Sequence, residues 1–397
     1  MIEVLLTDPE IVALVRRIHL GDEVGESIAR AAWTVIAEPG DAVAGTLIEA
    51  LGAVDALRIA VGDETSLVSA GGGAVSSRVL DDGRARWRPR AEPRAVSAAL
   101  RGAASVGAQL VIPGDAAWPD SLDDLGVHAP SALWVRGRAD LLRDAPRVAI
   151  VGARASSGYG EHVATEIAGD LAATGAVIVS GGAYGIDGAA HRAALGAQGA
   201  TIAFLAGGVD RAYPAGHQTL LRRIAEEGAL VSEPPCGTAP TKWRFLARNR
   251  LIAALGHATV VVEAGRRSGS LNTAGHAAAL GRPLGAVPGA VTSASSAGCH
   301  RLLREYDAQC VTSASEVREL FGSIDGSVEV SSAAMDPHHT RVLDAMSTRS
   351  RLSIDEVARR SGLSPDRVRS VLGLLHLEGD VARDDGGWRR APARRKG

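Results

Sequence analysis

The chain has 397 residues, two or three times the length of a typical domain of ~100–150 residues, so we expect more than one hydrophobic core. Apolar residues make up 46% and charged residues 22%, which excludes a disordered or collagen-like chain. The formal net charge of −2 gives no sign of an acidic polymer as a partner.

No apolar run reaches the ~18–20 residues of a membrane span, and the start, MIEVLLTDPE, is acidic where a signal peptide is basic. The three cysteines are odd in number and lack the spacing of metal ligands. We therefore expect a reduced cytoplasmic protein without a membrane span, a disulfide framework or a metal site.

Residues 1–62 carry apolar side chains at three- and four-residue spacing, interrupted by proline and glycine. This pattern predicts a small helical, SAM-like domain over residues 1–75. Residues 63–93 are rich in glycine, serine and arginine, a composition typical of a linker.

The next part, residues 76–325, is predicted to form the core. It begins with a helix over 95–108, strands over 108–114 and 132–137, and a short helix between these strands. Apolar, β-branched runs then alternate with helical stretches; the runs cover residues 147–153, 176–182, 201–208, 229–233, 258–264 and 283–289. Continuous apolar strands separated by helices predict an α/β fold with a Rossmann-like, doubly wound parallel sheet.

A second polar linker is predicted over residues 322–337. Three helical segments follow, over 339–347, 353–362 and 364–379, and a hairpin closes the chain with a turn at DDGG. This order predicts a winged helix within residues 326–397. From Asp336 onward there are 13 basic and 9 acidic residues, a net charge of +4, and the domain suits DNA or a protein partner equally.

Phosphate-suited loops are predicted at one edge of the sheet, because the carboxyl ends of parallel strands meet there. Glycines let the backbone approach a ligand, and amides at helix N-termini favour anions; the alternative is that these glycines only make the turns. The three loops contribute, in order, Gly152 and Arg154; Ser180, Gly181 and Gly182; and Arg266, Ser268, Gly269, Ser270 and Thr273.

The segment KWRFLARNRLIAAL interleaves Lys242, Arg248 and Arg250 with aromatic residues. Cations suit the phosphates of a single strand, and aromatic rings suit its unpaired bases; the alternative is a solvated loop entering a helix. Apart from Lys242 and Lys396, all 43 basic residues are arginine, so an arginine alone is weak evidence.

Other chemistry has less support in the sequence. The Gly-x-Gly-x-x-Gly motif and the P-loop motif are missing, so the sequence does not favour a nicotinamide-dependent oxidoreductase or a P-loop NTPase. We interpret Asp187 as a helix N-terminal residue and His191 as a packing or hydrogen-bonding residue, while Glu263 suits either a general base or an acceptor for loop amides. We expect no catalytic residue, cofactor or metal.

The middle of the chain resembles the DprA/Smf family of DNA-processing proteins. The resemblance runs over about residues 108–315 through VAIVGARASSGYG, SGGAYGIDGAAHRAAL, FLARNRLIAALG and VVVEAGRRSGSLNTAG, in that order. It implies a non-catalytic Rossmann-like core that binds and protects single-stranded DNA, forms a homodimer and loads RecA recombinase in natural transformation and recombination. It also assigns Asn249, between Arg248 and Arg250, to the binding segment.

Two features depart from the family pattern. Tyr184 stands where the family often has an arginine, which removes a cation and offers a stacking group. The N-terminal helical part lacks a clear Gly-x-Gly hairpin of a DNA-binding helix-hairpin-helix. Two other functions stay open: a nucleotide phosphoribohydrolase, on a related fold, and a winged-helix regulator that reads duplex DNA.

Overall fold

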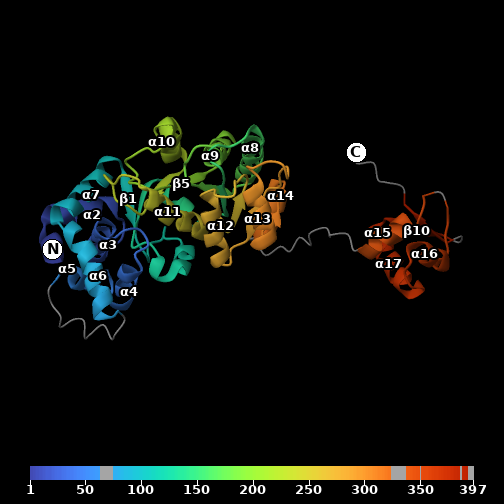
Figure 1. Ribbon diagram of the computed structural model, residues 1–397, viewed down its shortest axis with the longest axis horizontal. Helices are drawn as coiled ribbons and strands as arrows, with labels where there is room; N and C mark the ends of the chain where they lie inside the picture. Colours follow the sequence, from blue (N-terminus) through green and yellow to red (C-terminus); the bar gives the residue numbers. More distant parts are fainter. Residues whose placement is uncertain (63–74, 323–336, 349, 385–386, 392–397) are drawn as a thin grey trace. The chain divides into compact units, whose positions relative to one another are not determined.

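The computed structural model describes residues 1–62, 75–322, 337–348, 350–384 and 387–391. The chain divides into two compact units, Met1–Ile324 and Asp325–Gly397, each of which is described by itself (Figure 1). Within the described residues, no helix is long and apolar enough to cross a membrane. Cys236, Cys299 and Cys310 are all free thiols.

The first unit begins with a group of helices, as predicted for residues 1–62. Their apolar faces meet in one core that includes Leu5, Ile28 and Trp33. The helices are α1 (Ile2–Thr7), α2 (Pro9–Ile18), α3 (Val24–Ile36), α4 (Ala42–Leu51), α5 (Ala53–Val61), α6 (Ser77–Trp87) and α7 (Pro93–Ser105), with a 3-10 turn, η2 (Arg88–Arg90), after α6.

Helix α6 corrects the predicted linker, which is wrong over residues 77–90. The indole of Trp87 packs edge-on against Trp33, with ring centroids 5.3 Å apart, and its Nε1–H donates to Asp41 at 3.0 Å. The guanidinium of Arg84 donates twice to the carbonyl of Ile59. These contacts stabilise a helix whose polar, glycine-containing sequence has little helical propensity of its own. Residues 63–74 of the predicted linker lie outside the described residues.

A nine-stranded sheet forms the centre of this unit, in the order β1-β2-β6-β5-β4-β3-β7-β8-β9. Strands β3 to β9 run parallel, which confirms the predicted doubly wound sheet, while β1 and β2 extend it in antiparallel fashion beside β6. The strands are β1 (Ala108–Val111), β2 (Leu133–Gly137), β3 (Arg147–Val151), β4 (Val177–Ser180), β5 (Thr201–Leu205), β6 (Ala229–Ser232), β7 (Ala258–Val261), β8 (Leu284–Ala286) and β9 (Gln309–Cys310).

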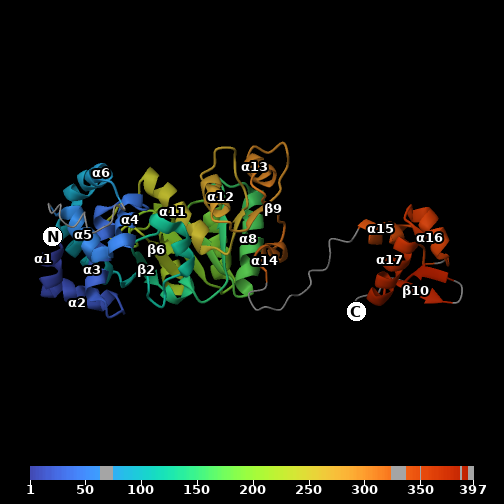
Figure 2. The same cartoon turned by 90° about the horizontal axis from the view of Figure 1, so that it is seen from below.

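Helices cover both faces of the sheet, because its strands are buried on both sides. One face packs against α8 (Gly158–Ala173), α9 (Ile186–Gly196) and α14 (Ala314–Phe321), and α10 (Gln218–Glu227) lies beside α9 (Figures 1 and 2). The other face packs against α11 (Lys242–Leu255), α12 (Ser270–Ala279) and α13 (Ala297–Glu305). Short 3-10 helices are η3 (Asp120–His128), η4 (Ala139–Leu142) and η5 (Ala215–His217).

The order of the strands reverses direction between β3 and β7. From β3 the chain first builds outward through β4, β5 and β6, and then returns to place β7 on the other side of β3. The loops that leave β3 and β7 therefore turn to opposite faces and leave a crevice at the carboxyl edge. Ligands of open α/β sheets bind at such a switch point.

The N-terminal helices share a hydrophobic core with this sheet. The same cluster contains Trp33 of α3, Trp134 of β2 and Leu205 of β5. The helices thus pack against the end of the sheet that β1 and β2 form, as Figure 2 also shows. The predicted domain boundary at residue 75 lies next to residues 63–74, which the structure does not describe, and it stays a prediction.

The second unit is a winged helix, as predicted. It contains α15 (Pro337–Asp344), α16 (Ile354–Ser361), α17 (Pro365–Glu378) and a hairpin of β10 (Val381–Asp384) and β11 (Gly387–Arg390). Ser353 and Ser364 cap α16 and α17 through their hydroxyl oxygens, as the sequence predicts. Two residues of the DDGG turn and residues 323–336 of the second predicted linker lie outside the described residues.

Candidate nucleic-acid interface

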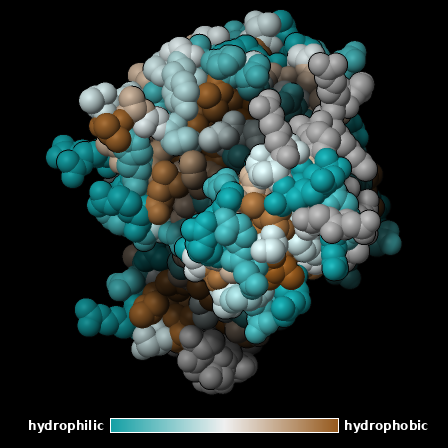
Figure 3. Space-filling model, turned by 90° about the vertical axis from the view of Figure 1, so that its right-hand side faces the viewer, coloured by the Kyte–Doolittle hydropathy of each residue, from teal (hydrophilic) through white to brown (hydrophobic). Residues whose placement is uncertain are grey.

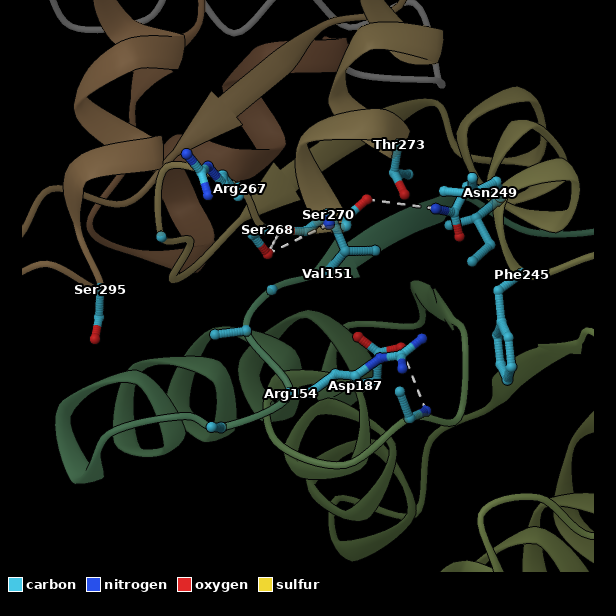
Figure 4. A pocket seen from close by; sticks show the side chains of 18 of the residues that line it. Val151, Arg154, Asp187, Phe245, Asn249, Arg267, Ser268, Ser270, Thr273 and Ser295 are labelled. Carbon is cyan, nitrogen blue, oxygen red and sulfur yellow. Dashed lines mark hydrogen bonds between the residues drawn. The ribbon is translucent and has the colours of Figure 1, made fainter. Parts of the chain in front are cut away.

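A cavity of about 690 Å³ lies at the switch point between β3 and β7. Its walls come from the loops after β3, β4, β7 and β8 and from the first turns of α11 and α12 (Figure 4). Eight of the predicted site residues line it: Gly152, Arg154, Arg248, Asn249, Ser268, Gly269, Ser270 and Thr273. The structure therefore brings residues from three separate sequence motifs to one cavity.

The loop after β3 supplies an exposed cation. Glu263 fixes this loop, because its carboxylate accepts the backbone N–H and the hydroxyl of Ser157, each at 2.8 Å. A side chain at Gly152 would collide with Ile186, so glycine permits the close approach of the loop to α9. From this loop Arg154 extends toward Phe245, with its Cζ 5.0 Å from the ring centroid (Figure 4).

Helix α11 supplies a buried cation and an aromatic ring. Arg248 is 6% exposed, and its Nη1 donates to the carbonyl of Phe204 at 3.0 Å. Its Cζ lies 5.9 Å from the centroid of Phe245, so two guanidinium groups lie within 6 Å of one ring. Burial lowers the pKa of Arg248 to about 10, which still leaves the side chain positively charged at neutral pH.

The turn after β4 lies beside Arg248 and is held by Asp187. One carboxylate oxygen of Asp187 accepts the N–H of Gly181 at 3.1 Å and that of Ala183 at 3.4 Å. Burial raises the pKa of Asp187, and the nearby charge of Arg248 opposes that rise. Asp187 is a residue of the first helical turn, as predicted, but it also lines the cavity, which the sequence did not indicate.

The loop after β7 brings small hydroxyl groups to the opposite wall. The hydroxyl groups of Ser268 and Ser270 are hydrogen-bonded at 2.7 Å, at the start of α12. Asn249 joins this wall to α11, because its Nδ2 donates to Asn272 at 3.2 Å. Arg267, on the same loop, also lines the cavity and is exposed. Hydroxyls, a helix N-terminus and a cation together suit a phosphate.

Six predicted site residues do not line the cavity. Ser180 and Gly182 are engaged within the fold: the hydroxyl of Ser180 donates to Ile150 at 2.6 Å, and the carbonyl of Gly182 accepts from His217 at 3.0 Å. Gly181 does not line the cavity itself but contacts two residues that do, Asp187 and Arg248. Lys242 and Arg266 are exposed outside the cavity wall.

Arg250 points away from the cavity into a buried ion pair. Its guanidinium contacts the carboxylate of Glu233 at 2.8 Å, and its Nε donates to the carbonyl of His128 at 2.9 Å. Glu233 in turn accepts the N–H of Gly40 in the N-terminal helical part. Arg250 thus joins α11 to the N-terminal helices, and its predicted contact with DNA stays a prediction.

The surroundings of His191 and Tyr184 can be compared with what the sequence predicts for these two residues. His191 is fully buried and lies 2.7 Å from the hydroxyl of Thr201, and burial lowers its pKa to about 3, which fits the predicted packing role. The hydroxyl of Tyr184 accepts the N–H of Gly216, and its ring packs edge-on against His217 at 4.8 Å. Tyr184 therefore orders the neighbouring loop and remains half exposed.

The loop after β8 forms a further wall of the cavity that the sequence motifs do not predict. Ala294 and Ser295 line the cavity, and the hydroxyl of Tyr159 holds this loop by donating to the carbonyl of Pro288 at 2.6 Å. The signal available in the sequence was position alone, since every loop after a parallel strand reaches the same edge. In the described part of the chain, no group of three or more histidine, cysteine or acidic residues is arranged to hold a metal ion.

Comparison with known families shows to which protein family the chain belongs. A family model described as DNA recombination-mediator protein A matches residues 109–322, more than half of the chain. The chain belongs to the DprA/Smf family. A second model, described as the DprA winged helix domain, matches residues 329–387 and agrees with the fold of the second unit.

Individual family members cover most of the first unit. The DNA processing protein DprA of Mycobacterium tuberculosis is 48% identical over 300 residues, which are 71% of this chain and 77% of that protein. The X-ray structure of DprA from Streptococcus pneumoniae has a TM-score of 0.61 and 30% identity, covering 75% of this chain and 98% of that chain. A structure of DNA processing protein A from Helicobacter pylori, described for its single-stranded DNA binding mode, has a TM-score of 0.48 and 33% identity, covering 53% of this chain and 94% of that chain.

Proposed function

We propose that the chain is a non-catalytic protein that binds single-stranded DNA, and that the DNA strand passes through the cavity at the β3–β7 switch point. The observation that carries the proposal is that Arg154 and Arg248 both lie close to the ring of Phe245, inside a cavity that also presents serine hydroxyls. Cations and an aromatic ring at one place match the phosphates and the unpaired bases of a single strand.

The phosphate contacts in this proposal come from two walls. Arg154 and Arg267 are exposed, and neither has an acidic partner within 4.0 Å among the described residues, so a phosphate need not displace a carboxylate. Ser268 and Ser270 offer hydroxyl groups at the N-terminus of α12, where the helix dipole favours an anion. A strand lying between the walls can thus be neutralised from both sides.

The base contacts in this proposal come from the first turns of α11. Phe245 lines the cavity, and the ring of Tyr213 lies next to it, with centroids 5.5 Å apart. Trp243, two residues earlier, is 76% exposed. Duplex DNA keeps its bases stacked on one another, so these rings favour a single strand over a duplex.

The alternative of a nucleotide phosphoribohydrolase gains little from the geometry. Glu263, the candidate base, is 2% exposed and does not line the cavity. Both of its carboxylate oxygens already accept hydrogen bonds from Ser157. A general base must reach a proton of the substrate or of a water molecule, and a carboxylate engaged in this way is a holder of the loop.

The family resemblance carries the finer parts of the proposal. These are protection of incoming single-stranded DNA, loading of RecA recombinase in natural transformation, a homodimer and a cytoplasmic location. The predicted domains 1–75, 76–325 and 326–397, and the role of Lys242, Asn249 and Arg266 in binding, belong to the same proposal, whereas the buried ion pair with Glu233 favours a structural role for Arg250. In this proposal the winged helix binds either DNA or a protein partner.

The test compares fluorescence anisotropy of an oligothymidine with that of a duplex of equal length, using the full chain. We expect the single strand to bind more tightly and Arg154→Ala to weaken it roughly tenfold, as expected for loss of a charged hydrogen bond. Arg94→Ala is the matched control, because Arg94 is an exposed arginine of α7 paired with Glu92. Equal binding of the two DNAs, or equal effects of the two variants, would contradict the proposal.

A further inference from the structure

The guanidinium of Arg248 contacts the backbone at two places, Phe204 and Gly181. On one side, its Nη1 donates to the carbonyl of Phe204 at the end of β5. On the other side is Gly181, where a side-chain Cβ would lie 1.8 Å from Nη1. Arg248 can occupy this position only because residue 181 is a glycine and because the turn after β4 holds its present course.

Asp187 determines the course of that turn. Its carboxylate accepts hydrogen bonds from the backbone of Gly181 and Ala183, one residue on each side of the Gly182 position where φ is +68°. Asp187 is 7% exposed and comes from α9, whereas Arg248 comes from α11 on the opposite face of the sheet. The two buried charges therefore meet through the turn between them.

One donor of Arg248 is left without a partner in this arrangement. Its Nε is buried and makes no hydrogen bond with any described residue, although the side chain lines the cavity. Buried donors in folded proteins are nearly always paired. The Nε itself is enclosed by the protein, but the side chain lines the cavity, so a ligand oxygen that enters the cavity meets a guanidinium whose position is fixed by Phe204 and Gly181.

We infer that Asp187 is a positioning residue for DNA: by fixing the Gly181–Ala183 turn, it holds the guanidinium of Arg248 in place for a phosphate in the cavity. The inference rests on the proposed function. It also gives a physical reason why an acidic residue lies in the wall of a cavity that binds anions. The carboxylate is directed at backbone N–H groups, so its charge is satisfied away from the strand.

Four single variants and one double variant of the full chain test this inference in salt titrations with oligothymidine. We expect Arg248→Ala, Asp187→Ala and Gly181→Ala each to weaken binding roughly tenfold and to reduce the slope of log affinity against log salt by about 0.7, the value for one phosphate of a single strand. Asp187→Asn keeps an amide oxygen that can accept both N–H groups, so its slope should stay close to that of the wild type. Asp187→Ala added to Arg248→Ala should reduce the slope no further.

Gly181→Ala keeps the test decisive if Asp187→Ala does not fold. It leaves Asp187 in place, the φ of Gly181 lies outside the left-handed region, and the added methyl meets only the movable end of Arg248. Gly169→Ala is the matched control, since a methyl group there meets open space on α8. Circular dichroism and thermal unfolding identify the variants that fold.

A wild-type slope in folded Asp187→Ala or Gly181→Ala, while Arg248→Ala loses one phosphate contact, would overturn the inference and leave the proposed function standing. An equal loss in Asp187→Asn and Asp187→Ala would also overturn it, because the asparagine retains the acceptor. If Arg154→Ala and Arg248→Ala both bind as the wild type does, the proposed function itself fails.

Discussion

The cavity of the first unit and the surface of the winged helix both present arginines, but these arginines have different partners. In the winged helix, Arg359 and Arg360 share Glu356, and Arg369 pairs with Asp366. In the cavity, Arg154 lies over Phe245 and has no acidic partner among the described residues. A cation already paired must give up a carboxylate before it binds phosphate, so the number of arginines does not measure the capacity to bind DNA.

The same contrast occurs within a single helix. Arg248 and Arg250 are two residues apart on α11, and both are buried. Arg248 lines the cavity, whereas Arg250 does not line it and has Glu233 as a partner. Because residues two apart in a helix lie on different faces, one arginine can serve a ligand while the other joins two parts of the fold.

The largest expected effect is on stability, and it separates these two arginines. Arg250→Ala should lower the free energy of unfolding by about 3–5 kcal/mol, because it leaves Glu233 buried without its cation. Urea denaturation measures this loss. The folded fraction should keep the wild-type salt slope for oligothymidine, which would assign Arg250 to structure.

A double variant provides the control for this prediction. Arg250→Met with Glu233→Leu removes both charges and should recover much of the lost stability, because an apolar pair of similar size replaces the ion pair. A folded Arg250→Ala that loses one phosphate contact in the salt titration would instead show that Arg250 binds DNA directly.

Phe245 should have the next largest effect, and its effect should be on affinity alone. Phe245→Ala removes a stacking surface, which we expect to cost about 1–3 kcal/mol of binding free energy. The slope of log affinity against log salt should not change, since no cation is removed. Anisotropy titrations at several salt concentrations measure both quantities.

Phe245→Tyr is the matched variant for this prediction, because it retains the aromatic ring. It should bind oligothymidine nearly as well as the wild type. If Phe245→Ala and Phe245→Tyr lose affinity equally, the contribution of Phe245 is not base stacking, and its role would be to pack beside Arg154 and Arg248.

The smallest effect is expected in the winged helix. Glu356 accepts hydrogen bonds from Arg359 and Arg360, and these two cations lower its pKa to about 2. Glu356→Gln frees both arginines from their carboxylate, so the salt slope of DNA binding should become modestly steeper if this unit meets nucleic acid. Glu10→Gln, which frees Arg101 in the helical part, is the control. An unchanged slope would favour a protein partner for the winged helix.

The sequence predicts the parallel sheet well, because each buried strand leaves a local apolar run that is followed by a helix. It does not predict α6, since the partners of its Trp87 are Trp33 and Asp41, more than forty residues earlier. Likewise, β1 and β2 are detectable as strands, but the antiparallel pairing of β2 with β6 depends on contacts distant in sequence. Local patterns give the elements, and long-range packing decides their partners.

The candidate site shows the same limit at the level of single residues. Glycine-rich loops after strands locate the edge of the sheet, and this places Arg154 and Ser268 correctly in the cavity. The face on which a helical arginine lies depends on its neighbours in space, so Arg248 and Arg250 look alike in the sequence. The role of Asp187 was also hidden, because its partners are backbone groups of a turn.

In the proposed function, unpaired cations of the cavity bind the phosphates of a single strand. The most direct test is the salt dependence of oligothymidine binding by the wild-type chain and by an Arg154→Ala/Arg267→Ala variant. We predict that the variant folds normally, since both side chains are exposed, and that the slope of log affinity against log salt falls by about 1.4, the value for two phosphates of a single strand. An unchanged slope in the folded variant would contradict the account.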